Sequence, residues 1–446
     1  MTNAQDISAR LDSLPLSRLH LAVAALCGIG LFVDTAELSL GSVLSAVFSV
    51  PGSPLDTGQL AWLLASVFIG GAIGAPLLGW LSDRHGRRTA LQISMALVAL
   101  PSFGAALSSE GTWLIVFRFL SGMALGAYPP LMHAYLADIL PPRWRAPLDM
   151  AAVSLGLLGW PLVALLVWWL TPWRPLDIEG WRWALHVGGV MSLGICAAFW
   201  LVPESPRNLA ARGQHLAAER AYGRFARSAG QSPPPAPSLS AVPNPSTGPA
   251  PRREFGRYWP RLVLIATIYL FRPWATVGFP LIVGALMIAK GYALDRSLLS
   301  IGFGGFGAAA GALLAAVVVD RIDRRMALTL VSAGLIAAGL VIALNTSYEL
   351  LVGAIAAFSF LAAIYGPVLS IYAAEIFPTG IRASATAIAW SMNRVGSAIA
   401  PLALLPTLQA AGPLTTFATI AITLLLSLLL IALFGPKGRA RLSVED

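Results

Sequence analysis

Charged residues are scarce in this chain of 446 residues: Asp, Glu, Lys and Arg make up only 11% of it, whereas 57% of the residues are hydrophobic. A soluble globular domain carries about 25% charged residues, so the composition excludes that class. Apolar runs of about 20 residues recur along the sequence, and a helix of that length spans the hydrocarbon core of a bilayer. The sequence therefore predicts an all-α membrane protein.

Cysteine is nearly absent as well. The two cysteines, Cys27 and Cys196, fall inside apolar runs, which indicates packing rather than a disulfide framework. The sequence also lacks metal-ligand spacings and any catalytic constellation, so we expect no metal, no bound cofactor and no enzyme. The net charge of +9 is spread over many loops. Contacts with anionic membrane lipid and topology signals explain this charge better than a nucleic-acid partner does.

The apolar runs predict twelve transmembrane helices in two bundles of six. A segment rich in Pro and Ser, residues 231–251, separates the bundles and is expected to be disordered. We expect an N-terminal tail (1–18), a first bundle (19–202), a central loop (203–259), a second bundle (260–434) and a C-terminal tail (435–446). The expected spans are approximately 19–42, 59–81, 90–108, 112–136, 148–170, 183–202, 260–287, 297–319, 327–344, 350–373, 385–408 and 414–434.

The distribution of basic residues predicts the orientation of these helices. Lys and Arg gather in the tails, the central loop and the loops on the same side, whereas the opposite side holds only Arg174, Arg182, Lys290 and Arg296. Because cytoplasmic loops are enriched in Lys and Arg, we expect both termini in the cytoplasm. A bacterial inner membrane is the expected location.

An internal repeat relates the two bundles. "DRHGRRTAL" begins at Asp83 and "DRIDRRMAL" at Asp320, while "YLADILPPRWRA" begins at Tyr135 and "YAAEIFPTGIRA" at Tyr372. Both pairs share one offset, which predicts pseudo-symmetric halves. In transporters built from such repeats, the substrate site lies near the membrane midplane between the halves.

These motifs resemble those of a known family. "GWLSDRHGRRTAL" is similar to the signature of the major facilitator superfamily between its second and third helices. "RFLSGMALGAYPP", "PESPR" and "IYGPVLSIYAAEIFPTGIRA" resemble its sugar-porter, niacin-transporter and aromatic-acid:proton symporter branches. The resemblance covers nearly the whole chain and implies the major facilitator fold, alternating access and function as a monomer.

Paired acids and arginines mark the expected cytoplasmic helix ends. Such groups can bond to each other, or to the neighbouring bundle, in one conformation and separate in another. The alternative is that they only anchor the helix ends as topology determinants. The expected gate consists of Asp83, Arg87, Arg88, Asp138, Arg145, Glu204, Arg207, Asp320, Arg324, Arg325, Glu375 and Arg382, with Asp138 opposite Arg145, Glu204 opposite Arg207 and Glu375 opposite Arg382.

Ionisable residues inside the spans are costly and therefore informative. Asp34 and Glu37 share one face of the first span, roughly 22 and 27 Å from its cytoplasmic end, and Arg118 lies roughly 27 Å along the fourth. An acid beside an arginine is held ionised, and their separation allows it to take a proton. The resemblance implies the same role for an acid on the first helix. We favour Asp34 as the proton-coupling residue over Glu37, with a permanent structural ion pair as the alternative.

The second half offers two arginines, Arg272 and Arg394, and no acid inside its spans. A guanidinium without a protein acid suits a carboxylate from outside. We therefore expect Arg394, and secondarily Arg272, to bind the substrate, although bonds to helix carbonyls or to a gate acid are an alternative for both. The remaining expected lining is Trp274, Tyr365, Tyr128 and Asn393.

The predicted function is proton-coupled uptake of a small organic anion, such as an aromatic or heteroaromatic carboxylate, driven by the proton-motive force. Sugar recognition needs many amides and hydroxyls, and the predicted seventh helix lacks Gln and Asn. A proton-antiporting drug or metabolite exporter and a transporter-like ligand sensor remain the alternatives.

Overall fold

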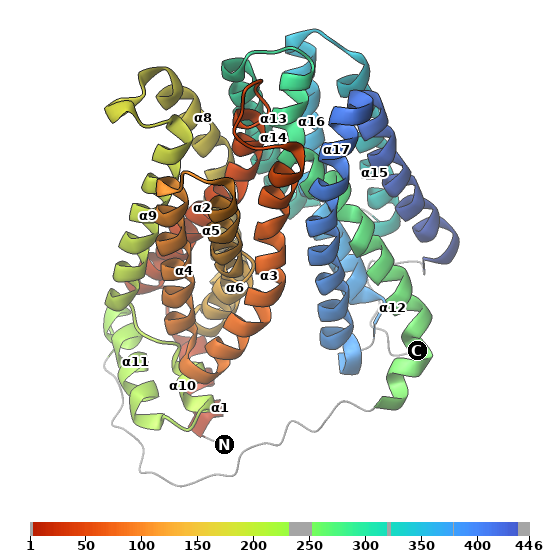
Figure 1. The fold of residues 1–446 in the computed structure, drawn as a ribbon. Coiled ribbons are helices and arrows are strands. Elements are labelled where there is room, and N and C mark those ends of the chain that lie inside the picture. The colour runs from red at the N-terminus through yellow and green to blue at the C-terminus, as the bar shows by residue number, and fades with distance from the viewer. Residues whose placement is uncertain (1–2, 232–251, 319–322, 378, 436–446) are drawn as a thin grey trace.

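The structure is a computed structural model that describes residues 3–231, 252–318, 323–377 and 379–435, and these residues are almost entirely helical (Figure 1). The predictions of a disordered linker over 231–251 and a tail over 435–446 lie almost wholly outside the described residues. Eleven helical stretches are long and apolar enough to cross a bilayer. The fold class predicted from composition is confirmed.

Six of these stretches form the first half. Breaks in two of them, next to Gly126 and Leu158, divide each stretch into two helices. The Pro residues that follow each break fit the first turn of a helix, where their missing N–H is not needed. The helices are α2 (Arg18–Val47), α3 (Thr57–His85), α4 (Arg87–Leu107), α5 (Gly111–Leu125), α6 (Tyr128–Ile139), α7 (Pro142–Leu157), α8 (Gly159–Trp173) and α9 (Gly180–Ala198).

The second half contains α12 (Arg252–Pro273), a short π-helical turn (Trp274–Gly278), α13 (Phe279–Ala289), α14 (Leu294–Val318), α15 (Arg324–Leu344), α16 (Tyr348–Glu375) and α17 (Thr379–Phe434). The last apolar stretch, Ile388–Phe434, has 47 residues. At 1.5 Å per residue it would be about 70 Å long, more than twice the hydrocarbon core. Gly412 has a φ of 78°, which only glycine adopts readily, and the chain reverses there (Figure 1). With this break, the last stretch is long enough to hold two of the twelve expected spans.

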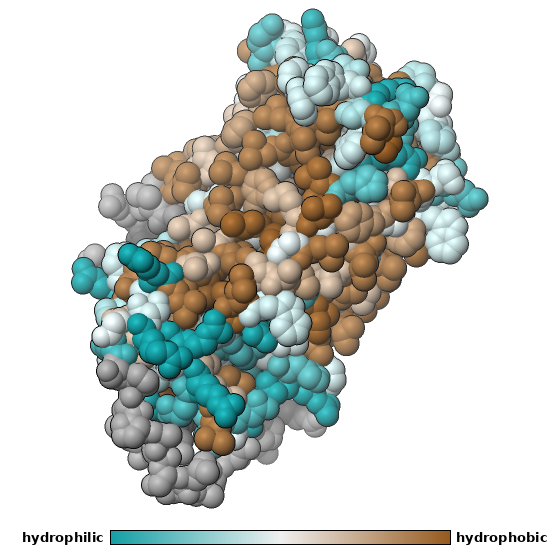
Figure 2. All heavy atoms as spheres, turned by 90° about the vertical axis from the view of Figure 1, so that its left-hand side faces the viewer, coloured by the Kyte–Doolittle hydropathy of each residue, from teal (hydrophilic) through white to brown (hydrophobic). Residues whose placement is uncertain are grey.

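A wide apolar belt covers the face of the molecule shown in Figure 2, between two polar zones at the ends of the helices. Large apolar side chains within the belt are exposed, among them Trp80 (54%), Leu100 (66%) and Val190 (62%). In water such a surface would cause association. The belt is therefore the surface that contacts the lipid chains.

Three short helices outside the bilayer define one end of the molecule, here called the linker end; the opposite end is the far end. They are α1 (Asn3–Ser13), α10 (Pro206–Ala211) and α11 (His215–Ser228). Ile7 and Leu11 of α1 are 1% exposed. Arg10 donates to Glu219 at 2.7 Å and lies 4.2 Å from the ring centre of Tyr222. Burial opposes the charge of Arg10, but these bonds outweigh it, so its pKa is raised.

The two halves approach closely from mid-depth to the far end. A Cβ atom on Gly284 of α13 would lie 2.5 Å from the Ser42 carbonyl of α2, so only glycine allows this approach. Ala285 N–H donates to Ser45 Oγ at 3.3 Å, and Thr57 bonds to Gln409. In Figure 1 the ribbons of α3 and α17 are close near the far end and diverge toward the linker end. The conformation is therefore closed at the far end.

Replacing Gly284 by alanine is expected to loosen this far-end contact, because the added methyl group meets backbone atoms that cannot rotate away. Overpacking of this kind costs about 1–3 kcal/mol. The measurement is the distance between spin labels at positions 57 and 409, which should lengthen. Gly353→Ala is the control, since a Cβ there meets nothing within 4 Å. An unchanged distance distribution in Gly284→Ala would contradict the interpretation.

Candidate functional site

A buried ion pair joins α2 to α5 inside the first half. Arg118 Nη1 donates to Glu37 Oε2 at 2.9 Å, and Arg118 Nη2 donates to the Glu37 backbone carbonyl at 2.9 Å. Ser102 Oγ of α4 donates to Glu37 Oε1 at 2.8 Å. Both charged side chains are at most 2% exposed. Every oxygen of this carboxylate therefore has a partner, as a buried charge requires.

The structure corrects one expectation here: Arg118 faces Glu37, not Asp34, which we had favoured from the sequence. Asp34 is 3% exposed, and its Oδ1 atom has no hydrogen-bond partner. Its strongest favourable charge interaction is with Arg394 of the opposite half. The two acids, three positions apart on α2, thus have different partners.

Arg394 lies on α17 at the interface between the halves. Its Nη2 atom donates to the Gly126 carbonyl at 2.9 Å, where α5 ends. Its Nε atom is buried and has no partner. No carboxylate among the described residues forms an ion pair with Arg394, and Asp34 of the first half is the acid whose charge favours that of Arg394. The alternative of a bond to a helix carbonyl is confirmed for one of its nitrogens.

Arg272 stands at the point where α12 ends in Pro273 and the π-helical turn begins. Its Nη1 atom donates to Asn393 Oδ1 at a long 3.4 Å, and its Nε atom is buried without a partner. A Cβ on Gly366 would lie 2.6 Å from Arg272 Nη2, so this glycine makes room for the guanidinium. No described carboxylate bonds to Arg272. This is the unpaired cation that the sequence predicted.

The aromatic residues predicted to line the site occupy different environments. Trp274, two residues after Arg272 in the chain, is half-buried, and Tyr365 is fully buried near the Arg272 guanidinium. Tyr128 is also fully buried, but its hydroxyl donates to the Cys27 carbonyl at 3.1 Å. A Cβ on Gly30 would overlap this hydroxyl. Tyr128 therefore fixes α6 against α2, whereas Asn393 is 7% exposed and bonds to Arg272.

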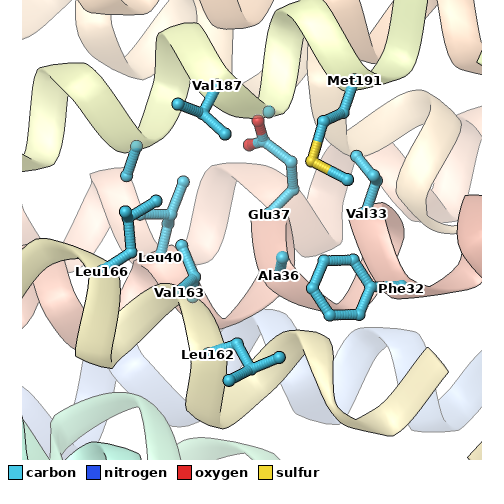
Figure 3. Close-up of a pocket in the computed structure, with 12 residues that line it drawn as sticks. Phe32, Val33, Ala36, Glu37, Leu40, Leu162, Val163, Leu166, Val187 and Met191 are labelled. Atoms are coloured by element: carbon cyan, nitrogen blue, oxygen red, sulfur yellow. The ribbon is translucent and has the colours of Figure 1, made fainter. Parts of the chain in front are cut away.

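A cavity of about 210 Å³ lies beside Glu37, between α2, α8 and α9. Figure 3 shows the Glu37 carboxylate pointing between Val187 and Met191, with apolar side chains on the other sides. Apolar cavities of this size stay dry. Glu37 therefore depends on Arg118 and Ser102, rather than on water, for its hydrogen bonds.

Gly188→Ala is expected to break the bond between Ser102 and Glu37, because a Cβ at position 188 would lie 2.5 Å from Glu37 Oε1. The expected loss of stability is about 1–3 kcal/mol, measured by thermal unfolding in detergent. Gly194→Ala on the same helix meets nothing within 4 Å and should be neutral or slightly stabilising. Equal melting temperatures for the two variants would contradict this account of Gly188.

The gate motifs of the first half form a network at the linker end. Arg87 donates to Asp83 at 2.8 Å and approaches Asp138 at 3.4 Å. Glu204 accepts the backbone N–H groups of Arg88 (3.0 Å) and Thr89 (3.4 Å), which begin α4. An acid at a helix N-terminus is stabilised by those N–H groups and by the helix dipole.

Two expected gate pairs are wrong in this conformation. Arg145 bonds to Asp12 rather than to Asp138, and Arg207 bonds to Asp12 rather than to Glu204, each at 2.5 Å. We had treated residues 1–18 as a polar tail and missed Asp12. The signal was the amphipathic spacing of Ile7 and Leu11 around Arg10, which allows α1 to dock. These bonds, like those of Arg87, stay within the first half.

The second half repeats only part of the pattern within the described residues. Asp323, which replaces the glycine of the first copy, accepts the Met326 N–H at 3.0 Å and caps α15. Arg324 is 7% exposed, and Arg325 bonds to the Ala432 carbonyl. Of the remaining expected gate residues, Asp320 lies outside the described residues, as do the side chains of Glu375 and Arg382.

The profile of the sugar (and other) transporter family matches residues 21–441. The chain belongs to this family. It is therefore a membrane transporter and not an enzyme, as its sequence predicts, and it has the major facilitator fold.

Individual members of the sugar (and other) transporter family agree with this assignment. The chain is 25% identical to the niacin transporter NiaP of Acinetobacter baylyi, with 89% of each chain covered. It is 28% identical to a gallate transporter of Pseudomonas putida, covering 87% of this chain and 85% of the relative. The crystal structure of a D-xylose-proton symporter superposes with a TM-score of 0.73 at 20% identity, covering 94% of this chain and 98% of the other.

Proposed function

We propose that this transporter is a proton-coupled symporter that takes up a small aromatic monocarboxylate. The observation that carries the proposal is Arg272, a cation of the second half whose only side-chain hydrogen-bond partner among the described residues is the amide oxygen of Asn393. A planar guanidinium binds a carboxylate through two parallel bonds. Arg394, which follows Asn393 in the chain, would supply a second positive charge beside the same carboxylate.

Two further observations favour an aromatic anion. Tyr365 lies near the Arg272 guanidinium and carries a flat apolar ring. Two relatives are named for niacin and gallate, which are both small aromatic carboxylic acids. A sugar would need more amides and hydroxyls than this part of the interface offers.

The buried acids of α2 supply the coupling to protons. A carboxylate inside the bilayer needs a cation or a proton, and both Asp34 and Glu37 face arginines whose separation would leave them to take one. With the linker end in the cytoplasm, the present conformation faces inward. Each proton that enters gains about 2.3 kcal/mol per 100 mV of membrane potential, which offsets the equal cost of bringing in one negative charge. The pH gradient would therefore drive uptake of one monocarboxylate with one proton across a bacterial inner membrane.

The test is thermal stabilisation of the purified protein by a panel of nicotinate, gallate, benzoate, D-xylose and a lipophilic cation, with Arg394→Ala alongside. Selective stabilisation by the carboxylates, lost in Arg394→Ala, is the expected result. Uptake of the stabilising ligand into proteoliposomes with an inward proton gradient then follows. Stabilisation by the cation alone would overturn the proposal in favour of an exporter. Carboxylate binding without uptake would favour a sensor.

A further inference from the structure

The cavity beside Glu37 is a space that the proposed transport of an anion does not use. Its volume is about 210 Å³, and all of its lining residues belong to α2, α8 and α9 of the first half. The guanidinium proposed to hold the substrate, that of Arg272, belongs to the second half. An engineered apolar cavity of about 150 Å³ stays dry and binds benzene or xenon. The cavity beside Glu37 is therefore large enough to hold a hydrocarbon ligand.

The lining of this cavity disfavours polar ligands. Glu37 is the one ionisable residue among the residues that line it. Its two carboxylate oxygens already accept hydrogen bonds from Arg118 and Ser102. A sugar or a carboxylate in this space would lose its hydrogen bonds to water and find no donor in exchange. A hydrocarbon has no such bonds to lose, so it is the class of ligand that the cavity suits.

The cavity is reached from the lipid. Leu162 of α8 and Val187 of α9 both line it, and they are 42% and 37% exposed. Val190, three residues after Val187 on the same helix, is 62% exposed and belongs to the apolar belt. Figure 3 shows side chains of α8 and of α9 on opposite sides of Ala36 and Glu37. The mouth of the cavity therefore lies between α8 and α9, where lipid chains contact the protein.

We propose that this cavity binds the end of a phospholipid acyl chain, which enters from the belt between α8 and α9. The hydrophobic effect contributes little to this binding, because the chain leaves hydrocarbon rather than water. The chain instead supplies the van der Waals contacts that the walls of an empty cavity lack. Met191, which lines the cavity, has an unbranched and flexible side chain that adapts to irregular spaces.

The bound chain also shields the ion pair between Glu37 and Arg118. The Glu37 carboxylate borders the cavity (Figure 3), so a chain in this space keeps water away from it. Two opposite charges attract each other more strongly where water is excluded. The first half thus carries lipid as a structural component, whichever substrate the carrier transports.

The experiment uses the full-length protein in nanodiscs of phosphatidylcholine that carries a photoreactive diazirine at the end of one acyl chain. After illumination, mass spectrometry identifies the labelled residues. Belt residues such as Val190 can be labelled from outside, so the informative positions are Val163 and Ala184, which line the cavity but are only 7% and 2% exposed. We expect label at these two buried positions as well as on the belt. Label confined to the belt would overturn the proposal.

Ala36→Leu tests whether the label arrives through the cavity, because the larger side chain fills the space. This variant should lose the label at Val163 and Ala184 and keep it at Val190. Ala25→Leu is the matched control, since Ala25 is exposed on the same helix and does not line the cavity; its labelling should equal that of the wild type. Val163→Phe fills the cavity from α8 and provides the same test at Ala184 if Ala36→Leu does not unfold cooperatively on heating. Label at Ala184 that persists in the filled variants would reveal another route to it and contradict a chain in the cavity.

Discussion

Arg118→Ala is expected to lower the free energy of unfolding by about 3–5 kcal/mol, the cost of removing one partner of a buried ion pair. The variant leaves the Glu37 carboxylate at the edge of a dry cavity, with the Ser102 hydroxyl as its remaining hydrogen-bond donor. It also removes the donor of the Glu37 backbone carbonyl. Thermal and denaturant unfolding in detergent would measure the loss.

Arg87→Ala supplies the control for this prediction. Arg87 also bonds to an acid, but the Asp83 side chain is 71% exposed, and exposed pairs contribute at most about 1 kcal/mol. The double variant Glu37→Leu and Arg118→Leu should recover much of the stability lost in Arg118→Ala, since apolar residues can replace a buried pair. A single Arg118→Ala variant as stable as Arg87→Ala would show that water, rather than protein, solvates Glu37.

The sequence predicts the helices of this protein more fully than it predicts the contacts between them. Apolar runs and a repeated motif determine the helices because the bilayer demands full backbone hydrogen bonding within each span. Helix α1 is an exception, because it is stabilised by docking on α10 and α11 and not by the bilayer. Its residue Asp12 therefore looked like part of a solvated tail, although it bonds to both Arg145 and Arg207.

The partners of Asp34 and Glu37 show a second limit of prediction from the sequence. Residues three apart on a helix differ in direction by about 60° around its axis, which is enough to point Glu37 at α5 and Asp34 at α17. The depth calculated from the sequence correctly placed Glu37 and Arg118 at the same level of the membrane. Depth does not show toward which neighbouring helix a side chain points, because that direction depends on how α2 is rotated within its bundle. Close contacts such as Gly188 on Glu37 and Gly284 on Ser42 settle the rotation, and these contacts join residues far apart in the sequence.

The two halves therefore divide the charges unequally. In the first half, the buried acid Glu37 accepts all its hydrogen bonds from residues of its own bundle. In the second half, Arg272 has no acid of its own, and the acid that interacts with Arg394 through charge belongs to the first half. Under the proposed function, an external anion would complete this charge pairing and draw the halves together around it. Such a role would account for cations at positions where structural stability alone would favour apolar residues.

Arg272→Ala is expected to raise the Kd for the carboxylate about 30-fold or more, because a buried charged partner contributes roughly 2–5 kcal/mol to binding. The same variant should be at least as stable as the wild type without ligand, since it removes a cation that no described carboxylate compensates. Ligand titration and thermal unfolding of one preparation would measure both effects. A structural role for Arg272 predicts the opposite change in stability.

Two further variants separate the charge of Arg272 from its placement. Arg272→Lys keeps the charge but loses the planar fork, and should restore only part of the affinity. Gly366→Ala keeps the guanidinium but displaces it, since a Cβ would lie 2.6 Å from Nη2, and should also weaken binding. If Arg272→Ala binds the carboxylate within threefold of the wild type, Arg272 is a packing residue. Arg394 would then be the cation that holds the substrate, and the loss of binding in Arg394→Ala would be complete.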